Sequence, residues 1–235
     1  LATRDGQRDR FHGRAGLSGT SVTFLGEGPL PERKGSWLFS VRRSYLDYLI
    51  KRIDPEGGFA FGFVDAQAKV EYDLTSKHQV SISTLLGRAV FEEGESTIHL
   101  NEIRRGVSRA WLTSLSWRYL PGPRFAVTQR LFFTGLNFDN VNDAGATIDA
   151  VRSTELGWRA DASFSPTTRT VIEFGGDVER LDGRNRLVRQ LSAATPPVTL
   201  NQYDERASAV SGYGQVRGGL GSPSRVAPRG RRDHR

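Results

Sequence analysis

The stretch FAFGFVDAQAKVEYDL (Phe59–Leu74) alternates polar and apolar residues over most of its length. The polar residues are Asp65, Gln67, Lys69, Glu71 and Asp73, and the apolar ones are Val64, Ala66, Ala68, Val70, Tyr72 and Leu74. Because successive side chains of a β-strand point to opposite faces, this period of two predicts one strand with a polar and an apolar side. The strand exceeds the usual length of about five or six residues, and this length and pattern are typical of a membrane β-barrel.

The same alternation recurs along most of the chain and predicts about nine long strands. The other candidates are Phe11–Glu27, Ser36–Tyr45, Gln79–Phe91, Val107–Tyr119, Arg124–Phe138, Arg152–Phe164, Arg169–Arg180 and Tyr203–Gly219. Short turns at 28–35, 75–78, 121–123 and 165–168 alternate with longer loops at 46–58, 92–106, 138–150 and 181–200. This arrangement predicts an all-β fold, an antiparallel up-and-down transmembrane β-barrel meander that is part of a larger barrel. An aromatic girdle is expected toward the short turns, from Tyr72, Trp111, Trp117, Tyr119, Trp158 and Phe164.

Composition excludes several classes of function. The chain has no cysteine, so neither a disulfide framework nor a thiolate metal site is possible. The net charge is +7, but residues 224–235 alone contribute +4, and the other charges alternate in sign; we therefore expect no nucleic-acid partner. The chain has no methionine and begins with Leu1, which suggests a fragment of a longer protein.

No catalytic or metal-binding set is evident in the sequence. The four histidines (His12, His78, His99 and His234) are far apart, which argues against a metal site. Glu173, Asp177 and Glu179 share one face of a predicted strand, and paired carboxylates can perform acid–base chemistry. Carboxylates that pair with arginines in a polar lumen explain them more simply. We therefore expect no enzyme activity and no cofactor.

Two segments resemble TonB-dependent outer-membrane receptors. The first is GSWLFSVRRSYLDYLI (Gly35–Ile50), and the second is FGFVDAQAKVEYDLTSKHQVSIS (Phe61–Ser83). The resemblance rests on Gly35-Ser36-Trp37 and Arg42–Asp47 in the first segment, and on Asp65, Gln67, Ala68 and Lys69 in the second. It implies a bacterial outer-membrane location and energised import of a scarce solute, such as an iron–siderophore complex, cobalamin or an oligosaccharide. The implied partners are outer-membrane lipid, lipopolysaccharide, and the TonB–ExbB–ExbD system acting through a plug domain.

The chain departs from this family in size. Family members have 22 strands and an N-terminal plug, whereas this sequence offers about nine strands and no plug. We therefore expect residues 1–220 to form a partial outer-membrane barrel. Residues 221–235 form a basic, irregular tail in which the alternation stops. A frameshift or assembly error near Gly221 would explain it, and so would a genuine disordered basic tail; we favour the former. A fragment of this kind, with two open sheet edges, is not expected to transport solute by itself.

The polar faces of the predicted strands supply the candidate site residues. The expected lumen-facing residues are Arg42, Asp65, Gln67, Lys69, Glu71, Arg159, Asp161, Glu173 and Asp177. Arg42 and Arg43 are adjacent and should point to opposite faces: Arg42 into the lumen, and Arg43 to the outer rim, within reach of lipopolysaccharide phosphates. An ordinary lumen salt bridge and a rim arginine that extends to the interface explain the pair more simply, and we prefer this interpretation.

Two other architectures remain open. One is a small closed outer-membrane barrel of eight or ten strands that acts as an enzyme or adhesion scaffold. The other is a soluble β-sandwich or lectin-like module, in which Trp111, Trp117 and Trp158 would pack against a second sheet. The sequence does not identify a solute.

Overall fold

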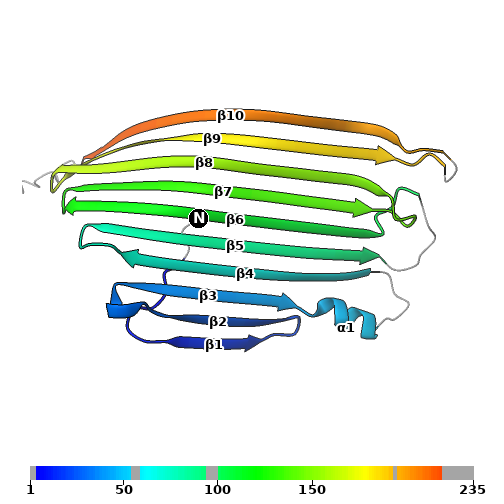
Figure 1. Cartoon of the computed structure of the whole chain (residues 1–235), viewed down its shortest axis with the longest axis horizontal. Helices are drawn as coiled ribbons and strands as arrows, with labels where there is room; N and C mark the ends of the chain where they lie inside the picture. The colour runs from blue at the N-terminus through cyan, green and yellow to red at the C-terminus, as the bar shows by residue number, and fades with distance from the viewer. Residues whose placement is uncertain (1–3, 54–58, 94–99, 193–194, 219–235) are drawn as a thin grey trace, which may run out of the picture.

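The computed structural model of the chain describes residues 4–53, 59–93, 100–192 and 195–218. These residues form one ten-stranded sheet in which every strand is antiparallel to its neighbours in sequence (Figure 1). The strands are β1 (His12–Leu17), β2 (Ser21–Pro29), β3 (Gly35–Ser44), β4 (Phe59–Asp73), β5 (His78–Glu93), β6 (Arg105–Gly122), β7 (Phe125–Val141), β8 (Thr147–Thr167), β9 (Thr170–Arg189) and β10 (Val198–Gly218). A short helix, α1 (Leu46–Ile53), and a 3-10 turn, η1 (Pro31–Arg33), are the remaining elements. The up-and-down meander predicted from the sequence is confirmed.

The alternating stretch forms β4, which pairs along its length with β5 and along most of it with β3. Residues directly opposite each other on paired strands share a face, so the register extends the two-faced pattern across the sheet. Asp65 lies opposite Arg42 on β3, whereas Val64 lies opposite Arg43. One face is therefore rich in charge and the other is mostly apolar.

The structure has ten strands where the sequence predicted about nine. The segment 11–27, expected as one strand, folds into the hairpin β1–β2. In its turn the Ser18 hydroxyl accepts hydrogen bonds from the backbone N–H groups of Thr20 and Ser21, at 3.3 and 3.0 Å. Such local side-chain bonds favour a turn over a continuous strand. The prediction of a single strand here was wrong.

Several loops are shorter than expected because the strands run farther. β7 continues to Val141 and β8 starts at Thr147, so the predicted 138–150 loop is mostly paired strand. Likewise β9 reaches Arg189 and β10 begins at Val198, within the predicted 181–200 loop. These extensions carry polar residues on both faces. The backbone pairing between strands therefore continues beyond the residues in which polar and apolar side chains alternate. The predicted tail, residues 221–235, lies outside the described residues.

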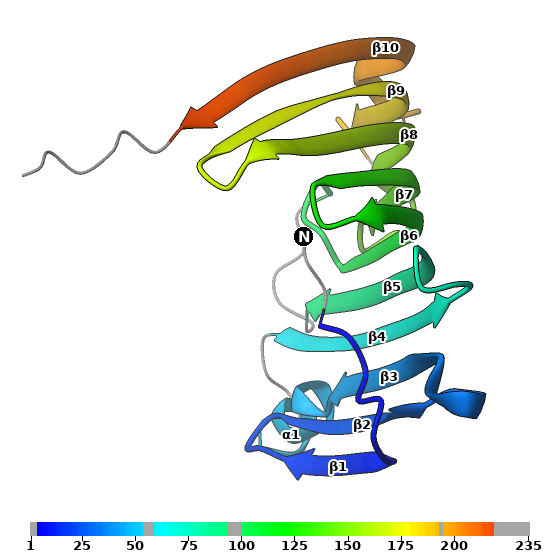
Figure 2. The ribbon, with the colours of Figure 1, turned by 90° about the vertical axis from the view of Figure 1, so that its left-hand side faces the viewer.

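The strands follow a shallow arc, and the N-terminal residues lie on its hollow side (Figure 2). The charged face is this concave face, because Arg8 of the N-terminal segment contacts Glu71 and Asp73 on β4. The sheet is one layer, and few apolar side chains are buried: Leu38, Ala60, Ile148 and Val188. The described residues therefore contain no second sheet against which Trp111, Trp117 and Trp158 could pack, as a β-sandwich would require.

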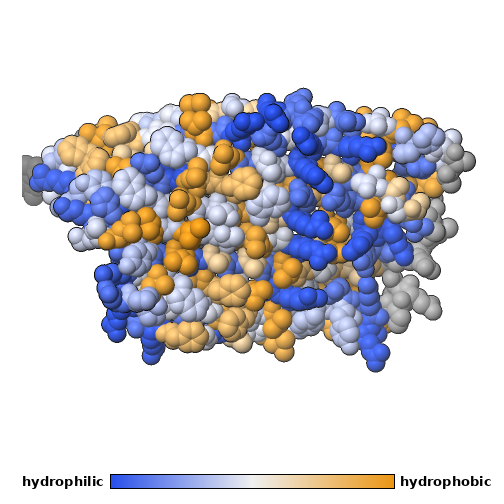
Figure 3. All heavy atoms as spheres, viewed as in Figure 1, coloured by the Kyte–Doolittle hydropathy of each residue, from blue (hydrophilic) through white to orange (hydrophobic). Residues whose placement is uncertain are grey.

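The convex face combines an apolar band with a column of hydrophilic side chains that crosses the strands (Figure 3). Toward the short turns, His78 stacks with Trp117 and Tyr119 at centroid distances of 5.6 and 4.6 Å. The sequence predicted Trp111 near the short turns as well. Trp111 instead lies on the opposite side of the apolar band, two residues from Arg109 on the same face of β6. Neither helix of the described chain has the length and apolar character needed to cross a bilayer.

Candidate functional site

The concave face holds a hollow of about 710 Å³ that crosses the middle of the sheet from β2 to β8. Arg42, Asp65 and Gln67 line it together with Thr134 and Leu112. Gly87 lies beside Asp65, and a Cβ there would make an ordinary van der Waals contact, at 3.6 Å, with the carboxylate oxygen. Three of the predicted site residues therefore lie in one hollow, whose other lining residues are largely apolar.

Arg42 and Asp65 form an ion pair inside this hollow. The Arg42 Nη2 donates to Asp65 Oδ2 at 2.6 Å and Nε at 3.2 Å, and the guanidinium lies 4.8 Å from the centre of the Phe63 ring. Both side chains are about half exposed, 52% and 43%. Both charged groups thus remain accessible to a solute on the concave face.

The N-terminal segment covers a second part of the concave face, over β2, β3 and β4. Arg8 donates hydrogen bonds to Glu71 and Asp73, and Gln79 of β5 donates to the same two carboxylates at 3.1 and 2.8 Å. The hydrogen bonds to Asp73 and Glu71 raise the pKa of the Arg8 guanidinium above its ordinary value. These ion pairs hold Arg8 on β4.

Two further side chains of the sheet, Glu27 and Lys69, hold the same segment. Glu27 of β2 is 1% exposed, pairs with Arg4 and accepts a hydrogen bond from the Gln7 backbone N–H at 3.3 Å. Lys69, another predicted site residue, pairs with Asp5. Of the predicted residues, Lys69 and Glu71 therefore serve to seat residues 4–8 on the sheet rather than to line the open hollow. No sequence pattern predicts this role, because the pairing joins residues that are far apart in the chain.

The remaining predicted residues lie on β8 and β9 of the concave face. Arg159 donates to Asp161 at 3.0 Å, and Asp161 also accepts a hydrogen bond from the Tyr213 hydroxyl of β10 at 2.8 Å. Glu173 pairs with Arg217 at 3.2 Å, and Asp177 accepts a hydrogen bond from Ser211 at 2.7 Å. All nine predicted residues share the concave face by register, but they fall into three separate groups.

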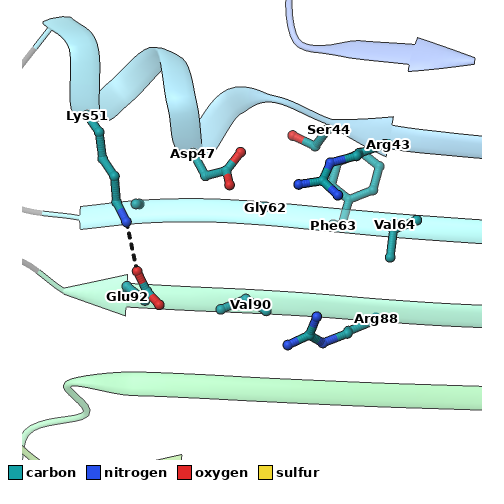
Figure 4. Close-up of a pocket in the computed structure, with 11 residues that line it drawn as sticks. Arg43, Ser44, Asp47, Lys51, Gly62, Phe63, Val64, Arg88, Val90 and Glu92 are labelled. Atoms are coloured by element: carbon teal, nitrogen blue, oxygen red, sulfur yellow. Dashed lines mark hydrogen bonds and ion pairs between the residues drawn. The ribbon is translucent and has the colours of Figure 1, made fainter.

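A smaller cavity, of about 230 Å³, lies on the convex face beside α1 (Figure 4). Gly62 admits the helix there, since a Cβ on it would be 3.2 Å from the Asp47 carboxylate. Lys51 reaches from α1 to Glu92 on β5 at 2.9 Å, and Arg43 and Arg88 line the cavity from β3 and β5. No prediction included this cavity, because only the strand register brings Arg43 and Arg88 together. Within the described ranges, no three His, Cys, Asp or Glu side chains converge as metal ligands would.

Comparison with known proteins yields a match in structure alone. No family model and no curated protein matches the sequence. Among solved structures, the chain is similar to the ferric-catecholate import receptor Fiu from E. coli K12 in its open form, with a TM-score of 0.57 and 10% sequence identity. The likeness is one of fold. It covers 91% of this chain and 46% of that receptor, so this chain spans about half the length of its structural neighbour.

Proposed function

We propose that this chain is a segment of an outer-membrane receptor barrel that imports a scarce solute. The observation that carries the proposal is the match of nearly the whole sheet to a receptor for ferric catecholates. The two-faced strands support it, because a barrel in a bilayer needs an apolar outer band and a polar interior. The concave hollow with Arg42 and Asp65 then belongs to the lumen.

The resemblance to TonB-dependent receptors extends this proposal to energised transport. Import would depend on the TonB–ExbB–ExbD system, and the solute would be an iron–siderophore complex, cobalamin or an oligosaccharide. The structural neighbour favours the iron complex among these three. Arg42 offers a guanidinium to an anionic chelate, and such charge-assisted hydrogen bonds are stronger than neutral ones.

Uptake of radiolabelled ferric catecholate by iron-starved cells tests this function. Cells that express the complete protein carrying this chain should accumulate iron, and a protonophore should abolish the uptake. Labelled cobalamin and a labelled oligosaccharide are the parallel arms. Absence of energy-dependent uptake for all three, with the protein present in the outer membrane, would refute the import function.

A further inference from the structure

The hollow on the concave face has an apolar floor between polar side chains. Two rows of directly opposed residues cross β4 to β7 there: Gln67–Leu85–Leu112–Thr134 and Asp65–Gly87–Ala110–Leu136. Each row begins with a polar side chain on β4, whereas its middle residues on β5 and β6 are apolar. The volume of about 710 Å³ is in the usual range of small-molecule sites, about 300–1,000 Å³. The hollow is therefore amphipathic and large enough for a small solute.

Small residues keep the middle of this floor open. Gly87 has no side chain and Ala110 has only a methyl group, so nothing tall stands between Asp65 and Leu136 in their row. Ala110 is exposed, and 42% of Leu136 is exposed on the far side of the gap. The described residues therefore leave apolar surface in contact with solvent at the centre of the hollow.

The charges in the hollow cancel, and some of its hydrogen-bonding groups are free. Arg42 and Asp65 are the two ionised residues in its lining, and both hydrogen bonds between them go to Asp65 Oδ2. The other carboxylate oxygen, Oδ1, lies beside Gly87. Within the described residues, neither this oxygen nor the Gln67 amide has a hydrogen-bond partner. Hydroxyl groups of a ligand would satisfy both, because a hydroxyl can donate and accept.

Phenylalanines cover the same face between the hollow and the longer loops. They are Phe59, Phe61 and Phe63 on β4 and Phe91 on β5. The ring centroids of Phe61 and Phe63 are 6.1 Å apart, and those of Phe59 and Phe91 are 6.4 Å apart. Phe59 is 55% exposed. Such ring faces can stack on an apolar face of a ligand ring, because stacking removes apolar surface of both from water.

We propose that the hollow binds a neutral sugar ring of the imported solute. The apolar C–H face of the ring lies on Leu85, Leu112 and Leu136. Hydroxyl groups at its edge donate to Asp65 Oδ1 and exchange hydrogen bonds with the Gln67 amide. A neutral ring suits the cancelled charge of the hollow, and hydroxyl groups suit its free acceptor.

This inference rests on the proposed function, because it takes the concave face to be the lumen of a receptor barrel. It goes further by naming the chemical class that one part of the lumen holds. An oligosaccharide presents such a ring, and so does an iron complex with a sugar substituent.

The test measures the binding of four neutral trisaccharides to the complete protein by isothermal titration calorimetry. The probes are maltotriose, cellotriose, mannotriose and xylotriose, and the detergent is lauryldimethylamine oxide, which has no sugar headgroup. Ala110→Leu fills the floor of the hollow and leaves every polar group in place. Ala209→Leu is the matched control, since Ala209 is an exposed alanine on β10, at the far edge of the sheet.

We expect at least one trisaccharide to bind the wild type and the control with equal affinity. Ala110→Leu should bind it about ten-fold or more weakly, because even one additional methylene group in a fitted pocket has an effect of about this size. Absence of binding for all four probes would overturn the inference, and so would unchanged binding by Ala110→Leu. A lower urea midpoint of Ala110→Leu with unchanged binding would mean that another part of the complete protein fills the hollow.

A second variant guards against misfolding. Gln67→Leu removes the free amide and should weaken binding by about three- to ten-fold, the usual effect of one neutral hydrogen bond. If Ala110→Leu proves unstable, this variant decides the question, and unchanged sugar binding by Gln67→Leu would then contradict the inference.

Competition experiments identify the source of the ring. A ferric catecholate with a glucosyl substituent and the same complex without it are each added to the bound trisaccharide. Displacement by the glucosylated complex alone assigns the ring to an iron complex, and displacement by neither assigns it to an oligosaccharide. Equal displacement by both would overturn the inference, because the second complex carries no sugar. Energy-dependent uptake without sugar binding would refute only this inference, whereas absence of such uptake refutes the proposed function itself.

Discussion

At the scale of single residues, the ion pair in the concave hollow makes a modest contribution to stability. Arg42 and Asp65 are both about half exposed, and such pairs contribute about 0–1 kcal/mol because solvent screens them. A double-mutant cycle with Arg42→Ala and Asp65→Ala, measured by urea unfolding in micelles, should give a coupling energy below about 1 kcal/mol. A coupling above about 2 kcal/mol would mean that the pair is more rigid and less accessible than described.

Glu27 is a contrasting residue, because its charge is buried. Its side chain is 1% exposed, forms an ion pair with Arg4 and accepts a hydrogen bond from the Gln7 backbone N–H. Glu27→Gln removes the charge from these bonds, which contribute about 1.5–3 kcal/mol when one partner is ionised. Trypsin should then cleave after Arg8 about ten-fold faster or more, as the segment leaves the sheet more often.

Glu179→Gln is the matched control for this experiment, since Glu179 lies on β9, far from the N-terminal segment in the sheet order. Its cleavage rate should equal that of the wild type. An unchanged rate for Glu27→Gln as well would show that residues 4–8 are held by other contacts.

The sequence predicted which residues are polar and on which face, but not their partners. Alternation places Arg42 and Asp65 on polar faces, yet their pairing depends on the β3–β4 register, which hydropathy does not specify. The same limit applies to Lys69 and Glu71, whose partners lie in the N-terminal segment. That segment has no periodicity, so no pattern could connect it to β4.

At the scale of strands, two aromatic side chains cover glycines on the neighbouring strand. Trp111 lies directly opposite Gly135, where a Cβ would be 2.1 Å from the indole, and Phe132 lies opposite Gly157 in the same way. Gly135→Val should displace the indole and destabilise the sheet by about 1–3 kcal/mol. The shift should appear as a change in tryptophan fluorescence and in the urea midpoint.

Gly214→Val is the control for this substitution, because a Cβ at Gly214 has open space around it within 4 Å. It should leave the fluorescence unchanged. If both variants behave alike, the β-branched side chain rather than the Trp111 contact is responsible.

Strand positions were predictable where hydropathy alternates and less so where it does not. The core of β5, from Gln79 to Phe91, was predicted almost to its ends, because Val80, Ile82 and Leu86 alternate with polar residues. The last residues of β7 and β9 were assigned to loops, because polar residues there occupy both faces. Hydrogen bonding to the neighbouring strand continues in these segments without an apolar face to reveal it.

At the scale of the whole molecule, we expect the convex face of the sheet to lie in lipid and the concave face to lie in water. The chain has no cysteine, so single-cysteine variants need no other change. Spin labels along β7 from Val127 to Gly135 should alternate: odd positions accessible to oxygen in the bilayer, and even positions accessible to a water-soluble nickel complex. Electron paramagnetic resonance of the complete protein in vesicles measures both accessibilities.

Arg130 and Leu131 are the informative neighbours in this series, since they are adjacent in sequence and lie on opposite faces. Equal water accessibility at both positions would show that the convex face is not in lipid. That result would favour a soluble arrangement and would remove the basis of the import proposal.

The attachment of the N-terminal segment has a mechanical consequence. Residues 4–8 are joined to the sheet through side chains, by the contacts of Arg4, Asp5, Gln7 and Arg8. A tensile load applied to this end would break those contacts one after another, as in peeling, because they are arranged in series along the pulled segment. The ladders between strands would bear little of that load. The segment can therefore detach at low force while the sheet keeps its shape.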